Sequence, residues 1–189
     1  METSLSELNR QVASCRKCAL WKMRRNPVLA EGSETAEIML VGLGPGYHEN
    51  LEEKPFVGAA EKLLDELLTL AGLDRKEIYL TNIIKCYLPN NQPTEEEITA
   101  CTPYLDEQVE IINPKVIIPL GNVANRYVFN KFRLRLASMG NLHGKIFSAS
   151  TLFLQVKIIP MYHPAAALRN PGLKDVVEND WRHLAEVSW

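Results

Sequence analysis

Four short apolar runs alternate with longer segments in which apolar residues recur every three or four positions. The runs cover residues 38–41, 78–84, 116–120 and 157–160, and each has the length of a buried strand. The longer segments have helical spacing and cover residues 5–12, 59–71, 94–112, 121–129 and 176–187. Strands that alternate with helices predict an α/β fold with a parallel sheet covered on both faces.

Local signals place some of the boundaries between these elements. Gly72 follows the second helical segment as a C-cap glycine would. Thr94 with Glu97 three residues later forms a capping box for the third helix. Residues 19–34 have no clear period and are expected to be irregular. The segment 131–150 predicts a loop and a β-hairpin around Gly140 and Gly144.

The segment 42–58 joins the first strand to the helix 59–71 and is rich in glycine and proline. A connection of this length in a compact domain is usually functional, and ligands of open α/β sheets bind where strands end. The stretch lacks the third glycine of a dinucleotide fingerprint and the closing Gly-Lys-Ser/Thr of a phosphate loop. The loops 82–91 and 162–170 follow other strands and should lie at the same sheet edge, which is the predicted site.

Composition narrows the class of protein. The chain has 189 residues, 46% hydrophobic and 23% charged, with a net charge of -2. This length suits one domain over residues 1–189 with a sizeable core. No apolar stretch has membrane-spanning length and the N-terminus lacks a secretion signal. We therefore expect an intracellular protein that is not secreted and contacts no membrane.

The four cysteines form two pairs, Cys15 with Cys18 and Cys86 with Cys101. In an intracellular protein, four cysteines that include one close pair suggest a metal centre before disulfides. A spacing of two lets both thiolates of one turn face the same metal. The spacing alone leaves zinc and a [4Fe–4S] cluster as alternatives, because both accept four thiolates. Either centre would be structural and would tie the N-terminal segment to the loop beside Asn82.

Several motifs together resemble the family 4 uracil-DNA glycosylases, the iron–sulfur members of their superfamily, found in thermophilic bacteria and archaea. They are Gly-x-Gly-Pro-Gly from Gly42, Pro-Phe-Val-Gly from Pro55, Thr-Asn-Ile-Ile-Lys-Cys from Thr81, and His-Pro-Ala-Ala-x-Leu-Arg from His163. With the cysteines, they cover nearly the whole chain in the family's order. The resemblance implies a three-layer α/β/α sandwich with a short central parallel sheet. It also implies a structural [4Fe–4S] cluster on Cys15, Cys18, Cys86 and Cys101.

The activity that the resemblance implies is hydrolysis of the N-glycosidic bond of deoxyuridine in DNA, leaving an abasic site. The base would be flipped into the pocket, stacked on Phe56 and read by the amide of Asn82. His163 would stabilise the uracil anion by a hydrogen bond to O2. Gly42, Leu43 and Gly44 would line the substrate site, with Glu49 near C5 of the base. The segment with Ala165, Leu168 and Arg169 would enter the DNA stack.

The sequence departs from this family where the attacking water is held. Leu43 stands where the family has a water-positioning glutamate, Asn50 replaces an aspartate, and Glu61 replaces the last glycine of Pro-Phe-Val-Gly-x-Ala-Gly. Loss of one acid–base contribution typically slows a reaction by about 10²–10⁴-fold. Glu49, Asn50 or a backbone carbonyl would then have to hold the water. Base recognition should be unaffected.

Three functional hypotheses follow. The first is a uracil-DNA glycosylase, slowed or altered in base preference. The second is a uracil-DNA binding or sensing protein that has lost the water site. The third is a nucleic-acid adaptor that contains zinc. We expect a monomer, located in the prokaryotic cytoplasm with the nucleoid, that acts on single- or double-stranded uracil-containing DNA. A sliding clamp is an expected partner of a repair enzyme, although no motif in the chain identifies one.

Overall fold

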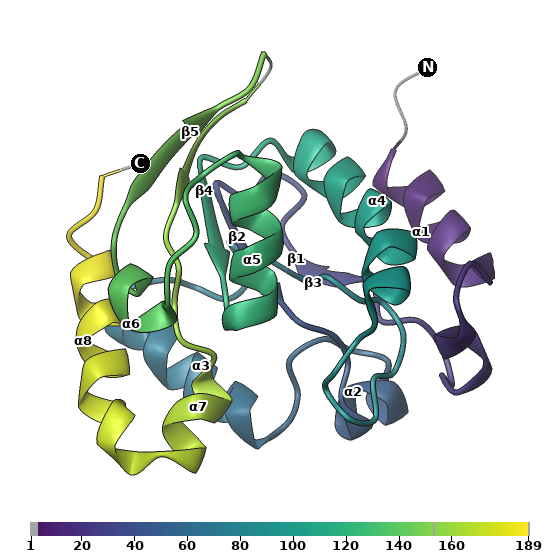
Figure 1. The fold of residues 1–189 in the computed structure, drawn as a ribbon, viewed down its shortest axis with the longest axis horizontal. Coiled ribbons are helices and arrows are strands. Elements are labelled where there is room, and N and C mark those ends of the chain that lie inside the picture. The colour runs from purple at the N-terminus through teal and green to yellow at the C-terminus, as the bar shows by residue number, and fades with distance from the viewer. Residues whose placement is uncertain (1–3, 153, 189) are drawn as a thin grey trace.

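The computed structural model describes residues 4–152 and 154–188. These residues form a six-stranded sheet in the order β1-β3-β2-β4-β6-β5 (Figure 1). The strands are β1 Ala30–Gly32, β2 Ile38–Gly42, β3 Tyr79–Asn82, β4 Val116–Pro119, β5 Phe147–Ser150 and β6 Gln155–Ile158. The four inner strands are parallel, as predicted, and the two edge strands are antiparallel to their neighbours.

Alternate residues of a strand point to opposite sides of the sheet, so the inner strands contribute residues to a hydrophobic core on each face. Met39 and Val41 of β2 pack in one core, and Ile38 and Leu40 pack in the other. The helices that contribute most residues to the first core are α1 Leu5–Ser14, α4 Glu95–Ile112 and α5 Asn122–Lys131. Those of the second core are α3 Ala59–Leu70, α7 Pro164–Arg169 and α8 Lys174–Leu184. This arrangement confirms the predicted three-layer α/β/α sandwich.

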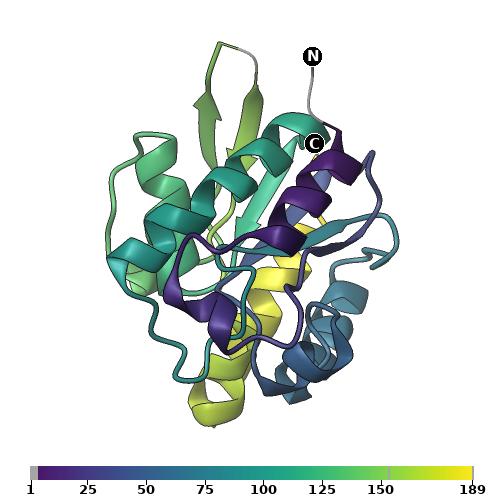
Figure 2. The same ribbon diagram turned by 90° about the vertical axis from the view of Figure 1, so that its right-hand side faces the viewer.

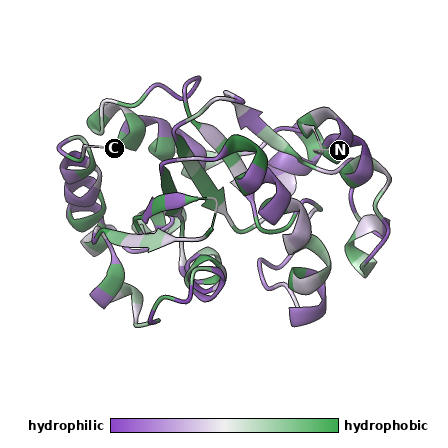
Figure 3. Ribbon diagram, turned by 90° about the horizontal axis from the view of Figure 1, so that it is seen from above, coloured by the Kyte–Doolittle hydropathy of each residue, from purple (hydrophilic) through white to green (hydrophobic). Residues whose placement is uncertain are grey.

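The figures show the same layers from other sides. α1 and α4 lie side by side on one side of the sheet (Figure 2). Coloured by hydropathy, the central strands are predominantly hydrophobic, and the surrounding helices carry both hydrophilic and hydrophobic positions (Figure 3). This distribution is expected of amphipathic helices that cover a sheet buried on both faces.

Two of the boundary signals are confirmed. The backbone N–H of Glu97 donates to Thr94 Oγ1 at 3.2 Å, and the N–H of Thr94 donates to Glu97 Oε2 at 2.8 Å. This is the reciprocal capping box predicted for α4. Gly72 follows α3 with a φ of 68°, a left-handed conformation that glycine adopts without steric cost.

Other local predictions were wrong or incomplete. The segment 42–58 contains a helix, α2 Tyr47–Glu52, and the segment 19–34 contains the 3₁₀ turn η1 Ala19–Lys22 as well as β1. Gly140 lies in the helix α6 Met139–Leu142, and the hairpin joins β5 to β6 instead. A second 3₁₀ turn, η2 Pro171–Leu173, precedes α8. These short elements depend on contacts with distant segments, so periodicity over a few residues does not reveal them.

The register of the inner strands brings their carboxyl ends to one edge of the sheet. Gly42 at the end of β2 lies opposite Asn82 at the end of β3. A bridge between Leu120 and Met161 continues the pairing of β4 with β6 and leads directly to His163. The predicted loops therefore meet at one place. Among the described helices, none is long and apolar enough to cross a membrane.

Candidate active site

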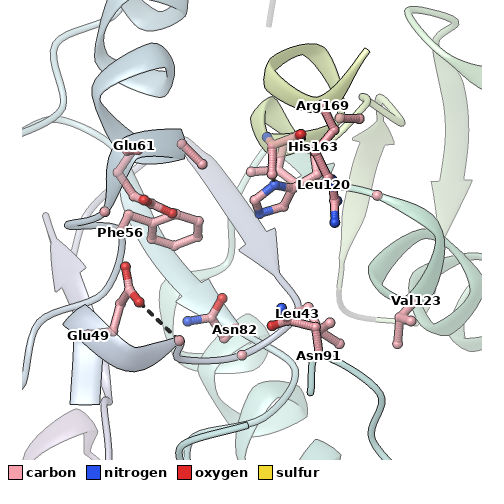
Figure 4. A pocket seen from close by; sticks show the side chains of 18 of the residues that line it. Leu43, Glu49, Phe56, Glu61, Asn82, Asn91, Leu120, Val123, His163 and Arg169 are labelled. Atoms are coloured by element: carbon pink, nitrogen blue, oxygen red, sulfur yellow. Dashed lines mark hydrogen bonds between the residues drawn. The ribbon is translucent and has the colours of Figure 1, made fainter. Parts of the chain in front are cut away.

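A cavity of about 700 Å³ opens at this sheet edge (Figure 4). Its walls come from the segments after the four parallel strands and from the first turns of α3 and α7. The predicted site residues that line it are Leu43, Gly44, Glu49, Phe56, Asn82, His163, Ala165 and Arg169. The structure therefore brings together most of the residues that the sequence singled out.

Gly42 lies behind the cavity wall and permits close packing of two predicted substrate-binding residues. A Cβ atom at this position would lie 2.4 Å from Asn82 Oδ1 and 2.9 Å from Phe56 Cζ. Both contacts are shorter than non-bonded atoms allow, so any larger residue would displace the amide or the ring. Gly42 thus permits the observed positions of Asn82 and Phe56.

The backbone of Phe56 is held in an unusual conformation. Its φ of 56° lies in the left-handed region, which costs a non-glycine residue roughly 1–3 kcal/mol. The guanidinium of Arg75 donates to the carbonyl oxygens of Phe56 at 3.0 Å and Pro55 at 3.2 Å. Arg75 is itself paired with Glu31 at 3.1 Å and with Asp65 at 2.8 Å. This arginine therefore fixes the turn that presents the Phe56 ring to the cavity.

Replacing Arg75 with methionine should lower the free energy of unfolding by about 1–3 kcal/mol, because two carbonyl acceptors lose their donor. It should also weaken binding of a pocket ligand, since Phe56 would no longer be held. Chemical denaturation and ligand titration measure the two effects. Arg10→Met is the matched control, because Arg10 is an exposed arginine on α1 that pairs with nearby Glu7. Equal stability of the two variants would contradict this role for Arg75.

Glu49 is buried and joins two segments of the site. Its Oε2 accepts the N–H of Gly46 at 3.0 Å, and its Oε1 accepts the N–H of Val57 at 3.1 Å. The carboxylate therefore bridges the start of α2 to the segment that follows Phe56. This bridge within the 42–58 connection holds its two ends together.

Leu43 and Asn50 occupy different environments. Leu43 lines the cavity with an apolar side chain. Asn50 is buried outside the described cavity lining, and its Oδ1 accepts the N–H of Arg25 at 2.8 Å. The amide oxygen of Asn50 is therefore engaged by the N-terminal segment, and its place at the reacting centre stays a prediction. Gly42 and Leu168 are the other predicted residues outside this lining.

His163 is the N-cap of α7, and Pro164 occupies the first turn. The N–H of Ala165 donates to His163 Nδ1 at 3.1 Å. Because Nδ1 accepts, a neutral ring must carry its proton on Nε2. Burial lowers the pKa of His163 to about 4, and the positive charge of Arg169 also lowers it. The negative charge of Glu49 raises this pKa, but by less. At neutral pH the site therefore contains an uncharged imidazole with an N–H donor directed into the cavity (Figure 4).

The predicted DNA-contacting residues lie on α7 rather than in a loop. Leu168 is an exposed large apolar residue, with 52% of its surface accessible. Arg169 lines the cavity, and its Nε donates to the carbonyl of Ala165 at 3.3 Å. The helix thus presents an apolar side chain and a cation beside the cavity mouth.

Lys85 connects the cavity wall to the cysteines. Its ammonium group is buried and donates to the carbonyl of Asn82 at 2.6 Å, to Thr81 Oγ1 at 2.7 Å and to Gln108 Oε1 at 2.7 Å. Its backbone N–H donates to Cys101 Sγ at 3.3 Å. One residue therefore fixes the strand end that carries Asn82 and also contacts a thiol.

The four cysteines come from three separate segments and influence one another electrostatically. Burial raises the pKa of the Cys18, Cys86 and Cys101 thiols, that of Cys101 to about 11, and neighbouring cysteines raise each of them further. Arg24 Nη1 donates to Cys86 Sγ at 3.0 Å. Arg24 also donates to the carbonyl of Cys15 at 3.1 Å. The sequence prediction that both pairs meet is therefore supported by these couplings.

This donor set fits a metal centre made of thiolates. Buried thiols with raised pKa values lose their protons when a cation binds them, and N–H donors directed at sulfur favour the charged form. Within residues 4–152 and 154–188, no three Cys, His, Asp or Glu side chains converge closely enough to hold a single metal ion. A cubane cluster differs from a single ion because each thiolate binds its own iron atom, so its cysteines lie farther apart.

Sequence reasoning missed several residues of the site. Asn91 and Tyr162 line the cavity, and Glu61 does so from the first turn of α3. Arg75 belongs to none of the motifs. Its contacts are with residues distant in sequence, so no local pattern reveals its role. A positive φ at Phe56 and Asn91 could not be inferred from residue type alone.

Comparison with known proteins agrees with this geometry. A family model of the Uracil DNA glycosylase superfamily matches residues 29–185. The chain is 44% identical to the type-4 uracil-DNA glycosylase of Sulfurisphaera tokodaii, over 98% of this chain and 85% of the relative. It is 45% identical to that of Saccharolobus solfataricus, over 94% and 83%, and 44% identical to that of Archaeoglobus fulgidus, over 97% and 93%. The fold, the cavity and these matches show that the chain belongs to the uracil-DNA glycosylase superfamily, among its type-4 members.

Proposed function

We propose that this protein is a DNA repair glycosylase that removes uracil from DNA and leaves an abasic site. The observation that carries the proposal is the convergence of Phe56, Asn82 and His163 on one cavity, in a chain of this family. A base within a duplex cannot reach such a cavity, so the nucleotide must be flipped out. The whole chain, residues 1–189, would act as one glycosylase domain.

Recognition of the base follows from the chemistry of the cavity walls. The ring of Phe56 stacks on the pyrimidine, which contributes about 1–3 kcal/mol in comparable base–aromatic contacts. The amide of Asn82 donates to O4 and accepts from N3–H of uracil. Cytosine presents the reverse pattern and would leave both groups unpaired, so it is rejected. Glu49 lies on the wall where the C5 methyl group of thymine would be placed.

Bond cleavage leaves negative charge on the departing uracil and positive charge on the deoxyribose. The Nε2–H of His163 donates to O2 and stabilises the anion as it forms. The neutral ring can serve as this donor because its single proton is on Nε2, with Nδ1 accepting the N–H of Ala165. Leu168 and Arg169 at the cavity mouth would fill the gap in the stack that the flipped nucleotide leaves.

The four cysteines would hold a structural [4Fe–4S] cluster. The proposal rests on the electrostatic coupling of the thiols, on the N–H donors from Arg24 and Lys85, and on the type-4 relatives. Bound there, the cluster would link the N-terminal segment to β3 and α4, and it takes no part in the hydrolysis.

A cleavage assay tests the function. A labelled oligonucleotide with one uracil is incubated with the protein and then treated with alkali, which breaks abasic sites; thymine and cytosine oligonucleotides are the matched substrates. Cleavage of the uracil strand alone is expected, and Asn82→Ala should slow it about 10- to 100-fold by removing the recognising amide. Tight binding of the uracil strand without cleavage would instead support a uracil-DNA sensing protein. If the protein neither binds nor cleaves the uracil strand, both assignments are overturned.

A further inference from the structure

A second carboxylate in the cavity has no role in the recognition described above. Among the described residues that line the cavity, two carry carboxylates, Glu49 and Glu61. Both oxygens of Glu49 accept backbone N–H groups that shape the site. Glu61 is half-buried at the start of α3, at the position where the family motif has a glycine. Hydrolysis by water needs a proton acceptor, so this second carboxylate is of chemical interest.

The two carboxylates lie on the same wall of the cavity. A Cβ atom at Gly58 would lie 2.6 Å from Glu61 Oε2 and 3.6 Å from Glu49 Oε1. Figure 4 shows both side chains on the side of Phe56, across the cavity from His163. Burial raises the pKa of Glu61, and the negative charge of Glu49 raises it further. The backbone N–H groups of Glu61 and Gly58 and the positive charge of Arg75 lower it by less. A raised pKa makes a carboxylate a stronger base.

The orientation of a bound base places this wall beside the reacting carbon. With O2 at His163 and the O4–N3 edge at Asn82, the C5–C6 edge of uracil faces Glu49 and Glu61. In Figure 4 Glu49 lies on the Asn82 side of the Phe56 ring and Glu61 on the opposite side, so Glu49 is assigned to C5. Glu61 then lies on the side of C6 and the deoxyribose. His163 Nδ1 already accepts the N–H of Ala165, and Leu43 has no proton acceptor.

Resting on the proposed glycosylase function, we propose that Glu61 is the catalytic residue that holds and deprotonates the attacking water. The water oxygen bonds to C1′ while the C1′–N1 bond breaks, and the bonding electron pair leaves with uracil. Glu61 takes the proton of the water and later releases it to solvent, from which the uracil anion takes a proton. The chain thus supplies from α3 a function that Leu43 cannot perform.

The test is the single-turnover rate of uracil release as a function of pH. Glu61→Gln should slow the reaction about 100-fold at pH 8, the lower end of general-base contributions. It should also remove the fall in rate that wild type shows on the acid side as Glu61 is protonated. Binding of uracil-containing DNA should not weaken. Glu66→Gln, an exposed residue of the same helix, is the matched control and should match wild type.

The outcomes separate this role from a structural one. A Glu61→Gln rate within about threefold of wild type, or a slow variant that keeps the acid limb, would overturn the proposal. If Glu61→Gln melts well below wild type, Glu61→Asp replaces it, because a shorter carboxylate still accepts N–H groups in the first turn. Slow cleavage by Glu61→Asp with the limb retained supports the role, and an unchanged rate overturns it. Wild-type protein that cannot cleave would overturn the glycosylase as well.

Discussion

Replacing His163 with alanine is expected to slow uracil excision about 100- to 1,000-fold, the usual loss when one donor to a developing anion is removed. The donor is the Nε2–H, because Nδ1 accepts the N–H of Ala165. Binding of uracil-containing DNA should change little, since the anion exists only as the bond breaks. Single-turnover kinetics and a binding titration with the same oligonucleotide measure the two effects separately.

The pH dependence of this variant distinguishes a neutral donor from a charged one. Burial and Arg169 lower the pKa of His163 to about 4, so the ring stays uncharged as the pH falls from about 8 to about 5. The ratio of the wild-type rate to the His163→Ala rate should therefore be constant over this range. A ratio that changes around pH 6.5, the ordinary value for histidine, would show a protonated donor instead. His183→Ala, an exposed histidine on α8, serves as the control.

Replacing Cys101 with alanine is expected to cause the largest loss of stability, on the order of 4–5 kcal/mol or more, because the proposed cluster would be lost. Cys101 is buried in α4 and contacts the N–H of Lys85, whose ammonium holds the carbonyl of Asn82. Without the cluster, the segment around Cys15 would be attached to α4 by contacts between individual side chains, such as the Lys17 ammonium over the Tyr104 ring at 4.6 Å. Uracil excision should fall as the end of β3 loosens.

The measurements are the iron and sulfide content, the visible absorption and the thermal melting of anaerobically purified protein. Wild type should contain about four iron and four sulfide per chain, as a cubane requires, and Cys101→Ala should lose both together with its cooperative melting. Ser14→Ala, an exposed change beside Cys15, is the control. Zinc in place of iron in the wild type, or a variant that melts like wild type, would contradict this assignment.

The sequence by itself determined the elements that depend on neighbouring residues. The alternation at residues 38–41 fills both cores from β2, and Thr94 with Glu97 starts α4 through contacts three residues apart. Because ordered parallel strands end at one edge, the motifs containing Asn82 and His163 were expected to meet, and they do. These predictions needed only contacts between residues close in sequence and the rule that parallel strands end at one edge of the sheet.

The tertiary structure alone decided what depends on contacts between distant residues. The edge strand β1 forms because residues Ala30 to Gly32 pair with the side of β3 that faces away from β2. No local sequence pattern predicts this pairing. Asn50 turns away to the N–H of Arg25, and Arg75 reaches back to the carbonyl of Phe56. In the sequence, Glu61 was noted only as the replacement of a motif glycine, whereas the structure places its carboxylate on the cavity wall. Residue type fixes what a side chain can do, but the direction in which it points is set by partners far along the chain.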